Sequence, residues 1–222
     1  MKSGRRDFFA VAITLAMQFR RLLAGVTLIV LLNFCCELHA QVAPSDLPAA
    51  QALRDRIAAL SPCVRADEAR YVAECACATA AQLRRDYGVI GGPPSFQNFL
   101  VNLGIRKRGL CFQWAEDLLV QLDALKLRTL ELHWAEAWAG SWREHNCVVV
   151  TAKGQPFRQG IILDCWRHSG HLFWSPLASD HYPWIEDRNY ATVVRTKFSA
   201  RKKSRLADLR NTDLESVRPT GL

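Results

Sequence analysis

Three residues in the middle of the chain carry the side chains that thiol chemistry needs. Cys111 opens the apolar segment CFQWAEDLL, His145 opens a Val-rich segment, and Asp164 follows an Ile-Ile-Leu run. A cysteine thiolate is a nucleophile, an imidazole can take the thiol proton and return it to a leaving group, and a carboxylate can hold the imidazole in one tautomer. The order Cys, His, Asp therefore predicts nucleophilic catalysis if the fold brings these side chains together.

The position of Cys111 favours a reactive thiol. Apolar residues recur at spacings of three and four from Cys111 to Leu125, which predicts a helix that packs on a hydrophobic sheet. A thiol at a helix N-terminus lies at the positive end of the macrodipole, which lowers its pKa and raises the thiolate fraction. The alternative is that Cys111 only fills core space, as many free cysteines do.

Three segments after this helix predict a small antiparallel sheet. They are 128–134, which alternates, 145–151, which is rich in Val, and 160–166, which carries Ile, Ile and Leu. Turn residues at 153–156 predict that the second and third segments pair as a hairpin. Because residues two apart on a strand point to one face, we expect His145 to share a side with Cys147 and Val149, and Asp164 with Ile162 and Trp166.

The fold class predicted is α+β, with a helical N-terminal part before the cysteine helix and its sheet. Helical spacing indicates helices over 49–60, 67–87 and 96–103, with Ser95 as the cap of the third and glycines after the second and third. Four parts follow: a signal peptide or membrane anchor at 1–40, a linker and helices at 41–94, a catalytic core at 95–190, and a basic tail at 191–222.

The N-terminus has the order of a signal peptide. Arg20 and Arg21 precede an apolar run, and Ala40 offers a small residue at a cleavage site. An uncleaved membrane anchor is the alternative, because the run is near the lower length for spanning a bilayer. Either way we expect the rest of the chain to be exported, periplasmic or extracellular. The net charge of +8 is concentrated near the two ends and no nucleic-acid-binding motif accompanies it, so we expect no nucleic-acid partner.

Six cysteines remain outside the leader: Cys63, Cys75, Cys77, Cys111, Cys147 and Cys165. In an oxidising compartment an even set suggests disulfides, and we expect a bridge from Cys63 to Cys75 or Cys77. If Cys111 stays reduced to act, at least one other cysteine is also unpaired. The C-x-C spacing at 75–77 lacks the second pair of a zinc framework, so no metal or cofactor is predicted.

The segments 109–115 (GLCFQWA), 144–146 (EHN) and 163–166 (LDCW) resemble the transglutaminase-like branch of the papain-like cysteine-enzyme superfamily. The resemblance covers about 95–184. It implies that Cys111 is the nucleophile, His145 the general base and Asp164 the orienting carboxylate, with the cysteine at the start of a core helix and the other two on adjacent strands. Members commonly hydrolyse peptide or amide bonds or transfer acyl groups to amines, and some have lost catalysis.

Other polar residues have alternative roles. We expect an oxyanion hole from the Cys111 backbone N–H and a side chain of Gln97 or Asn98, although Asn98 and Asn102 could instead tie a loop. His133 is an alternative base, but no aspartate follows it at comparable spacing, so we expect it to be structural. The remaining histidines are assigned to an aromatic surface loop that lines the cleft, where metal binding is the alternative; they are His168, His171 and His181.

The function predicted is an exported thiol-dependent hydrolase or acyltransferase that acts on peptide or amide bonds, with a cell-wall peptide as a candidate substrate. One alternative is a catalytically silent module that binds a peptide or protein partner in the same cleft. Another is a membrane-tethered scaffold whose basic tail contacts anionic lipid or polymer.

Overall fold

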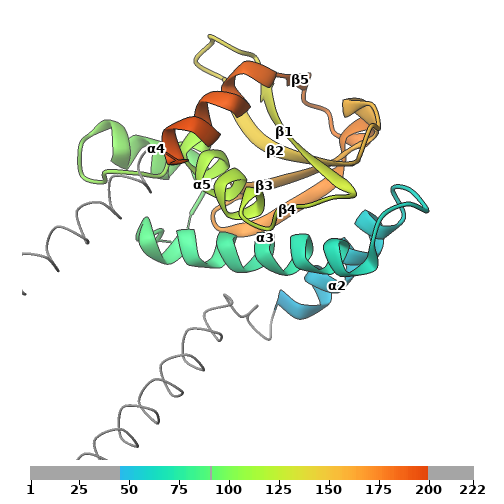
Figure 1. The fold of residues 1–222 in the computed structure, drawn as a ribbon. Helices are drawn as coiled ribbons and strands as arrows, with labels where there is room; N and C mark the ends of the chain where they lie inside the picture. Colours follow the sequence, from blue (N-terminus) through green and yellow to red (C-terminus); the bar gives the residue numbers. More distant parts are fainter. Residues whose placement is uncertain (1–45, 91, 200–222) are drawn as a thin grey trace, which may run out of the picture. The chain divides into compact units, whose positions relative to one another are not determined.

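The structure is a computed structural model that describes residues 46–90 and 92–199. It is an α+β fold built on a five-stranded antiparallel sheet with the strand order β4-β3-β2-β1-β5 (Figure 1). The helices are α2 (Leu47–Ala58), α3 (Ala66–Asp86), α4 (Pro94–Asn102) and α5 (Cys111–Asp123), and residues 188–199 are also helical. The strands are β1 (Leu130–Ala137), β2 (His145–Ala152), β3 (Ile161–His168), β4 (His171–Pro176) and β5 (Ile185–Glu186).

The main core lies between the sheet and the helices on one of its faces. Leu118 and Leu122 of α5 are fully buried in the same cluster as Val148 of β2 and Leu163 of β3. Helix α3 packs against α5 and β4, and α2 packs against α3. Apolar residues of α5 at spacings of three and four therefore do bury one helix face against a hydrophobic sheet, as their periodicity predicts.

A second, smaller cluster lies on the opposite face of the sheet. It contains Cys147 and Val149 of β2, Ile162 of β3, and Leu177 and Trp184 from the segment after β4. Every residue of β2 is buried, which is the pattern of a strand covered on both faces. The segment between β4 and β5 thus covers a face that no helix covers in the described part of the chain.

The predicted hairpin is confirmed: β2 and β3 pair antiparallel, with Val148 opposite Leu163. A turn and a short 3-10 helix, Phe157–Gln159, connect them. Gly160 is required at the entry to β3, because a Cβ there would lie 2.4 Å from a Val149 methyl carbon.

Two local predictions differ from the structure. Ser95 does not cap α4, which begins one residue earlier at Pro94, because a proline at the first helical position has its φ preset for the helix. The predicted loop after Trp166 contains the edge strand β4, which pairs with β3. The segment lacks the strict polar and apolar alternation of a half-buried strand, so its strand character comes from this pairing.

The predicted domain boundary at 190/191 falls inside the C-terminal helix. Ala191 and Val194 of this helix are buried in the main core, together with Leu53 of α2 and Val72 of α3. The predicted leader at 1–40 and most of the basic tail lie outside the described residues. Among the helices that the structure does describe, none is both long and apolar enough to cross a membrane.

Candidate active site

Cys111 is the first residue of α5, and its backbone is held by a local hydrogen-bond cap. The Gln113 side-chain oxygen accepts from the backbone N–H groups of Gly109 at 2.7 Å and Leu110 at 3.1 Å. Gly109 has a φ of 143°, a conformation that side chains with a Cβ rarely adopt. The chain thus turns sharply into the helix, and Cys111 is left 9% exposed at the N-terminal end.

His145 and Asp164 form a buried pair on neighbouring strands. The His145 Nε2 and Asp164 Oδ2 atoms are 2.7 Å apart, and the two residues are 3% and 2% exposed. The other ring nitrogen, Nδ1, is buried and has no hydrogen-bond partner among the described residues. The carboxylate therefore occupies one side of the imidazole and leaves the other side available for a proton.

The pKa of His145 is raised to about 9. Burial works against the charged ring, but the negative charge and hydrogen bond of Asp164 outweigh it, and the nearby Cys111 side chain adds to the rise. Cys111, His145 and Asp164 are thus brought into one electrostatically coupled group. This is the arrangement in which an imidazolium can stabilise a neighbouring thiolate.

Asp164 accepts from three donors besides His145. Its Oδ1 accepts from the backbone N–H groups of Trp166 at 2.9 Å and Arg167 at 3.0 Å. Its Oδ2 also accepts from Arg167 Nε at 3.2 Å, and Arg167 Nη1 donates to Asp180 at 2.6 Å. Although burial alone would raise the pKa of Asp164, the charges of His145 and Arg167 lower it below its usual range. The carboxylate is therefore charged and fixed in position.

The backbone bonds to Asp164 accompany an irregularity in β3. The pairing of β3 with β4 shifts register between Asp164 and His168. Cys147, Val149 and Ile162 lie in the cluster on the face away from the helices, as strand alternation predicts. Trp166 does not share that face with them, because the bulge turns it to pack against the helix-side core. The prediction that Trp166 follows the alternation is wrong for this reason.

Aromatic rings enclose the imidazole. The ring centroid of His145 lies 4.8 Å from Trp166 and 5.5 Å from both Tyr182 and Trp184. Asp180 orients two of these residues, since it accepts from the Tyr182 backbone N–H and from the Trp184 indole N–H. The enclosure lowers water access to the ring, which strengthens its interaction with Asp164.

Asn146, for which the sequence predicts no role, also contacts the Cys111 thiol. Its Nδ2 donates to Cys111 Sγ at 3.9 Å and to a carboxylate oxygen of Glu144 at 3.1 Å, and its Oδ1 accepts from Trp134 Nε1 at 3.1 Å. An indole N–H can only donate and a carboxylate can only accept, so these partners fix which end of the amide faces the sulfur. The presence of the polar Asn146 in a Val-rich predicted strand is the sequence feature that could have indicated a role for it.

The Cys111 thiol has a second polar neighbour, Glu144, in the loop that precedes β2. Its S–H is placed to donate to the backbone carbonyl oxygen of Glu144 at 3.5 Å. The Glu144 carboxylate in turn accepts from the backbone N–H of Gly140 at 2.8 Å. The loop between β1 and β2 is therefore tied to Cys111 and leads directly into His145.

The two predicted oxyanion donors lie on α4. Gln97 is buried and its Nε2 donates to the Ile90 carbonyl at 2.8 Å, while Asn98 accepts from Trp166 Nε1 at 3.1 Å. Gln97 thus ties α4 to the preceding loop, and Asn98 ties it to the aromatic wall of the site. Their role toward an oxyanion stays a prediction.

His133 has the structural environment that we expected. Its two ring nitrogens lie 2.7 Å from Glu186 and 2.9 Å from Thr151, so both are occupied by side chains of neighbouring strands. His168 and His171 stand opposite each other at the end of the β3–β4 pair, and the His181 ring packs edge-on against Tyr182. In the part of the chain that is described, no group of three or more His, Cys, Asp or Glu side chains could hold a metal ion.

The predicted disulfide from Cys63 to Cys75 or Cys77 is wrong. All six cysteines between residues 46 and 199 are free. Cys63 precedes α3, whereas Cys75 lies nine residues beyond the first residue of that helix, a rise of about 14 Å at 1.5 Å per residue. A disulfide needs its Cα atoms roughly 6 Å apart, so the helix separates these residues.

Burial raises the pKa of Cys147 well above its usual value. This thiol lies on the same strand face as His145 and is fully enclosed, so it stays protonated. Cys147 and Cys111 lie close enough to interact electrostatically.

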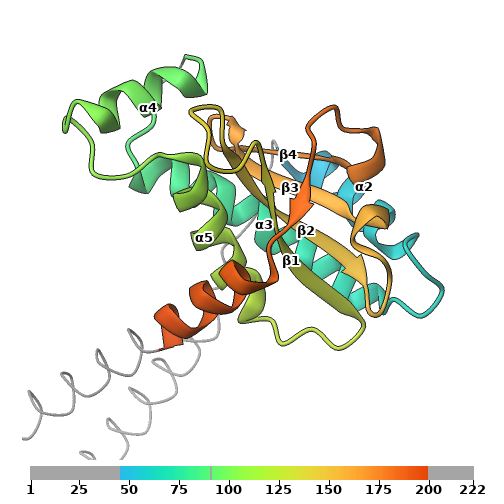
Figure 2. The same cartoon turned by 90° about the horizontal axis from the view of Figure 1, so that it is seen from above.

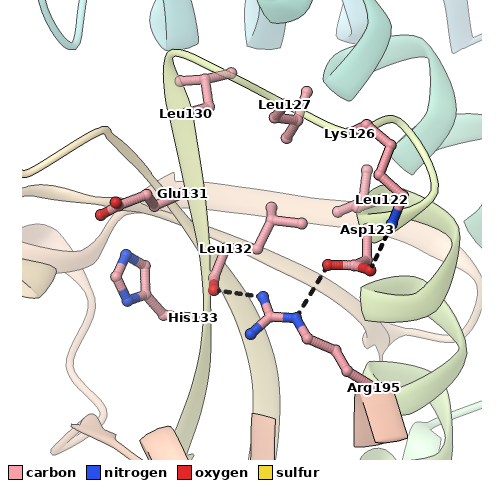
Figure 3. A pocket seen from close by; sticks show the side chains of 9 residues that line it. All are labelled: Leu122, Asp123, Lys126, Leu127, Leu130, Glu131, Leu132, His133 and Arg195. Atoms are coloured by element: carbon pink, nitrogen blue, oxygen red, sulfur yellow. Dashed lines mark hydrogen bonds and ion pairs between the residues drawn. The ribbon is translucent and has the colours of Figure 1, made fainter. Parts of the chain in front are cut away.

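A cavity of about 400 Å³ lies elsewhere in the fold (Figure 3). It is formed between the C-terminal end of α5 and β1, where Arg195 binds Asp123 and the Leu132 carbonyl oxygen. Cys111 lies at the other end of α5, twelve residues away from Asp123 or about 18 Å along the helix. This cavity is therefore separate from the candidate site.

Comparisons with protein-family models, with curated proteins and with solved structures found no match.

Proposed function

We propose that the protein is an exported thiol-dependent hydrolase or acyltransferase of the transglutaminase-like type, which acts on peptide or amide bonds through Cys111. The observation that carries the proposal is the buried His145–Asp164 pair at 2.7 Å, with the free Nδ1 of the ring beside the thiol. A histidine that served only the core would be expected to use both nitrogens, as His133 does.

In the first half of the reaction His145 Nδ1 takes the proton of the Cys111 thiol. The thiolate sulfur attacks the carbonyl carbon of the amide, and the carbonyl π electrons move to oxygen. When this intermediate collapses, the C–N bond breaks and His145 returns the proton to the leaving amine. The product of this half is a thioester on Cys111.

In the second half His145 takes a proton from water or from an acceptor amine. The resulting attack breaks the thioester C–S bond, gives an acid or a new amide, and returns the proton to the Cys111 sulfur. Asp164 stays ionised throughout and stabilises the imidazolium that forms in each half. Hydrolysis and transfer differ only in which nucleophile reaches the acyl group.

Two groups near Cys111 would stabilise negative charge, one on the thiolate sulfur and one on the substrate carbonyl oxygen. The backbone N–H of Cys111 is at the first helical position, where no intrahelical acceptor exists. The Asn146 amide already donates toward the sulfur. We assign this amide to the thiolate and the backbone N–H to the oxyanion.

The test is site-resolved alkylation of the native protein by iodoacetamide, read by mass spectrometry of the cysteine peptides. We expect Cys111 to react at least tenfold faster at pH 7 than the exposed Cys63, although Cys111 is almost buried. Substituting His145→Ala should remove this excess, because the proton acceptor and the imidazolium charge are lost.

Cys63→Ala serves as the matched control and should leave the reactivity of Cys111 unchanged. In a cellular assay of the native protein, Cys111→Ala should abolish turnover while the circular dichroism spectrum is retained. If Cys111 reacts no faster than Cys63 and His145→Ala makes no difference, the activated-thiol mechanism fails.

A further inference from the structure

Helix α4 turns its apolar side to solvent. Phe96, Phe99 and Leu103 recur at spacings of three and four, so they lie on one helix face. These three residues, together with Ile90 before the helix and Ile105 after it, are 39% to 66% exposed. We call these five residues the α4 surface.

The opposite side of α4 is the one that faces the rest of the fold. Gln97 is buried there, Asn98 bonds Trp166, and a Val101 methyl carbon lies 3.3 Å from where a Cβ on Gly109 would be. A surface helix normally buries its apolar stripe and exposes its polar one. The reversal in α4 means that the apolar stripe is available to something outside the described fold.

In both views α4 lies at the periphery, near the N-terminal end of α5 (Figures 1 and 2). Its two connections lead into a cavity of about 650 Å³. Its lining includes four cationic residues, Arg85, Arg106, Lys107 and Arg108, and two carboxylates, Asp86 and Asp117, so positive charge predominates. The buried Nε of Arg106 has no partner among the described residues. A cationic cavity of this size fits a phosphate-bearing group.

The sequence around α4 carries positive charge only. Between Asp86 and Glu116 the chain has three cationic residues, at 106–108, and no carboxylate. Arg108 is partly neutralised by Asp117, whereas Lys107 is exposed and has no ion pair among the described residues. An exposed apolar face next to an excess of cations is the composition of a helix that lies in a membrane interface.

We propose that the α4 surface docks on an anionic phospholipid membrane. The apolar side chains enter the boundary between headgroups and acyl chains. Arg85, Arg106 and Lys107 bind headgroup phosphates at the cavity beside the two connections of α4. A nine-residue helix cannot span a bilayer, so it lies in the plane of the interface. The proposal does not depend on the thiol chemistry.

Charge favours lipid over a second copy of the chain. Two copies that met through the α4 surface would bring their cationic residues together, and such like-charge contacts are unfavourable. An anionic membrane supplies the complementary sign. The inner side of α4 contacts Trp166, whose ring packs on His145, so docking would hold the candidate site near the lipid surface.

The experiment is flotation with vesicles of phosphatidylcholine containing phosphatidylglycerol, compared with vesicles of phosphatidylcholine alone. It uses residues 41–222, which contain both clusters of the described core, so that the predicted leader cannot account for binding. We expect binding to the anionic vesicles that weakens with salt. Phe99→Glu with Leu103→Glu should weaken it at least tenfold, and Arg85→Glu with Lys107→Glu should weaken it and reduce its salt dependence.

Val193→Glu with Leu47→Glu is the matched control, since it places the same two charges on exposed apolar residues of other helices, and it should leave binding unchanged. Thermal melts establish that each variant folds. The proposal is overturned if no vesicle binds, or if the Phe99 and Leu103 variant binds as well as the parent chain, because the tail would then account for binding. It is also overturned if Phe99→Glu instead removes self-association in solution, or if inorganic phosphate stabilises the protein while vesicles do not bind.

Discussion

A single carboxylate controls the chemistry of the site at the residue scale. Asp164 holds one nitrogen of His145, raises the pKa of the ring and leaves the other nitrogen without a partner among the described residues. Its own charge is secured by Arg167 and by two backbone N–H groups of the β3 bulge. The carboxylate thus orients the base and sets its pKa.

The pKa of His145 gives a prediction with a definite sign. Because it is raised from 6.5 to about 9, the folded protein holds a proton between these values that the unfolded chain releases. The stabilisation is full below pH 6.5 and is lost as the pH rises through 9, by about 3 kcal/mol at most. NMR titration of the His145 ring and urea unfolding at both pH values measure this. In Asp164→Asn the pKa should fall and the pH dependence should shrink, whereas an unchanged titration would contradict the role of Asp164.

Asn146 gives a second prediction at this scale. Asn146→Asp combined with Glu144→Gln reverses the donor and acceptor between these two side chains while keeping the oxygen that accepts from Trp134. It replaces an N–H near the sulfur by a carboxylate oxygen, which disfavours the thiolate. We expect iodoacetamide to alkylate Cys111 about tenfold more slowly at pH 7. Glu144→Gln alone is the control, and equal rates in both variants would rule out a role for the amide.

Helix α5 is the element that positions Cys111, the proposed nucleophile, and the Gln113 side chain caps its first turn. The residue before Cys111 is a leucine, whose side chain cannot cap a helix. Instead, the Gln113 side-chain oxygen accepts from the backbone N–H groups of Gly109 and Leu110. The conformation of the chain where it enters α5 therefore depends on these two hydrogen bonds to the Gln113 side chain.

Gln113→Ala should therefore lower the free energy of unfolding by about 1 kcal/mol, since two backbone donors lose their acceptor. It should also slow Cys111 alkylation, because the first turn of α5 loses its restraint. Gln121→Ala changes an exposed glutamine on the same helix and should alter stability by less than about 0.5 kcal/mol. Urea denaturation compares the two, and equal effects would show that Gln113 acts through helix propensity alone.

On the scale of the whole molecule, Glu68 joins α3 to the segment before β1. This carboxylate is mostly buried and accepts from the backbone N–H of Arg128 and from both the backbone N–H and the hydroxyl of Thr129. Burial would raise its pKa, but the hydrogen bonds of Thr129 and Arg128 lower it. Residues sixty positions apart are thereby connected at the edge of the main core.

Glu68→Gln should cost about 2 kcal/mol, because an amide cannot accept all of these bonds and its NH₂ group faces donors. Because the pKa of Glu68 is lowered, its stabilisation is present above its unfolded value of 4.5 and is lost as the pH falls. Glu74→Gln, an exposed residue of the same helix, is the control. Unfolding curves at pH 7 and pH 4 measure both, and equal stability of the two variants would contradict the assignment.

Much of the core and the members of the candidate site could be predicted from the chain alone. The spacing of leucines after Cys111 indicates one buried helix face, and the Val-rich and Ile-rich segments indicate two strands joined by a turn. These patterns are local, since apolar side chains recur along one element with a period that the backbone geometry sets. The types Cys, His and Asp also limit the chemistry before any geometry is known.

The tertiary structure decided the features that depend on partners far along the chain. The bulge that turns Trp166, the strand character of β4, the amide of Asn146 at the thiol and the outward apolar side of α4 all arise from contacts between separate elements. The periodicity of one segment does not encode such contacts, because each contact also depends on which residue of another segment packs there. The sequence by itself determined which groups could react, and packing decided that His145 keeps one nitrogen free beside Cys111.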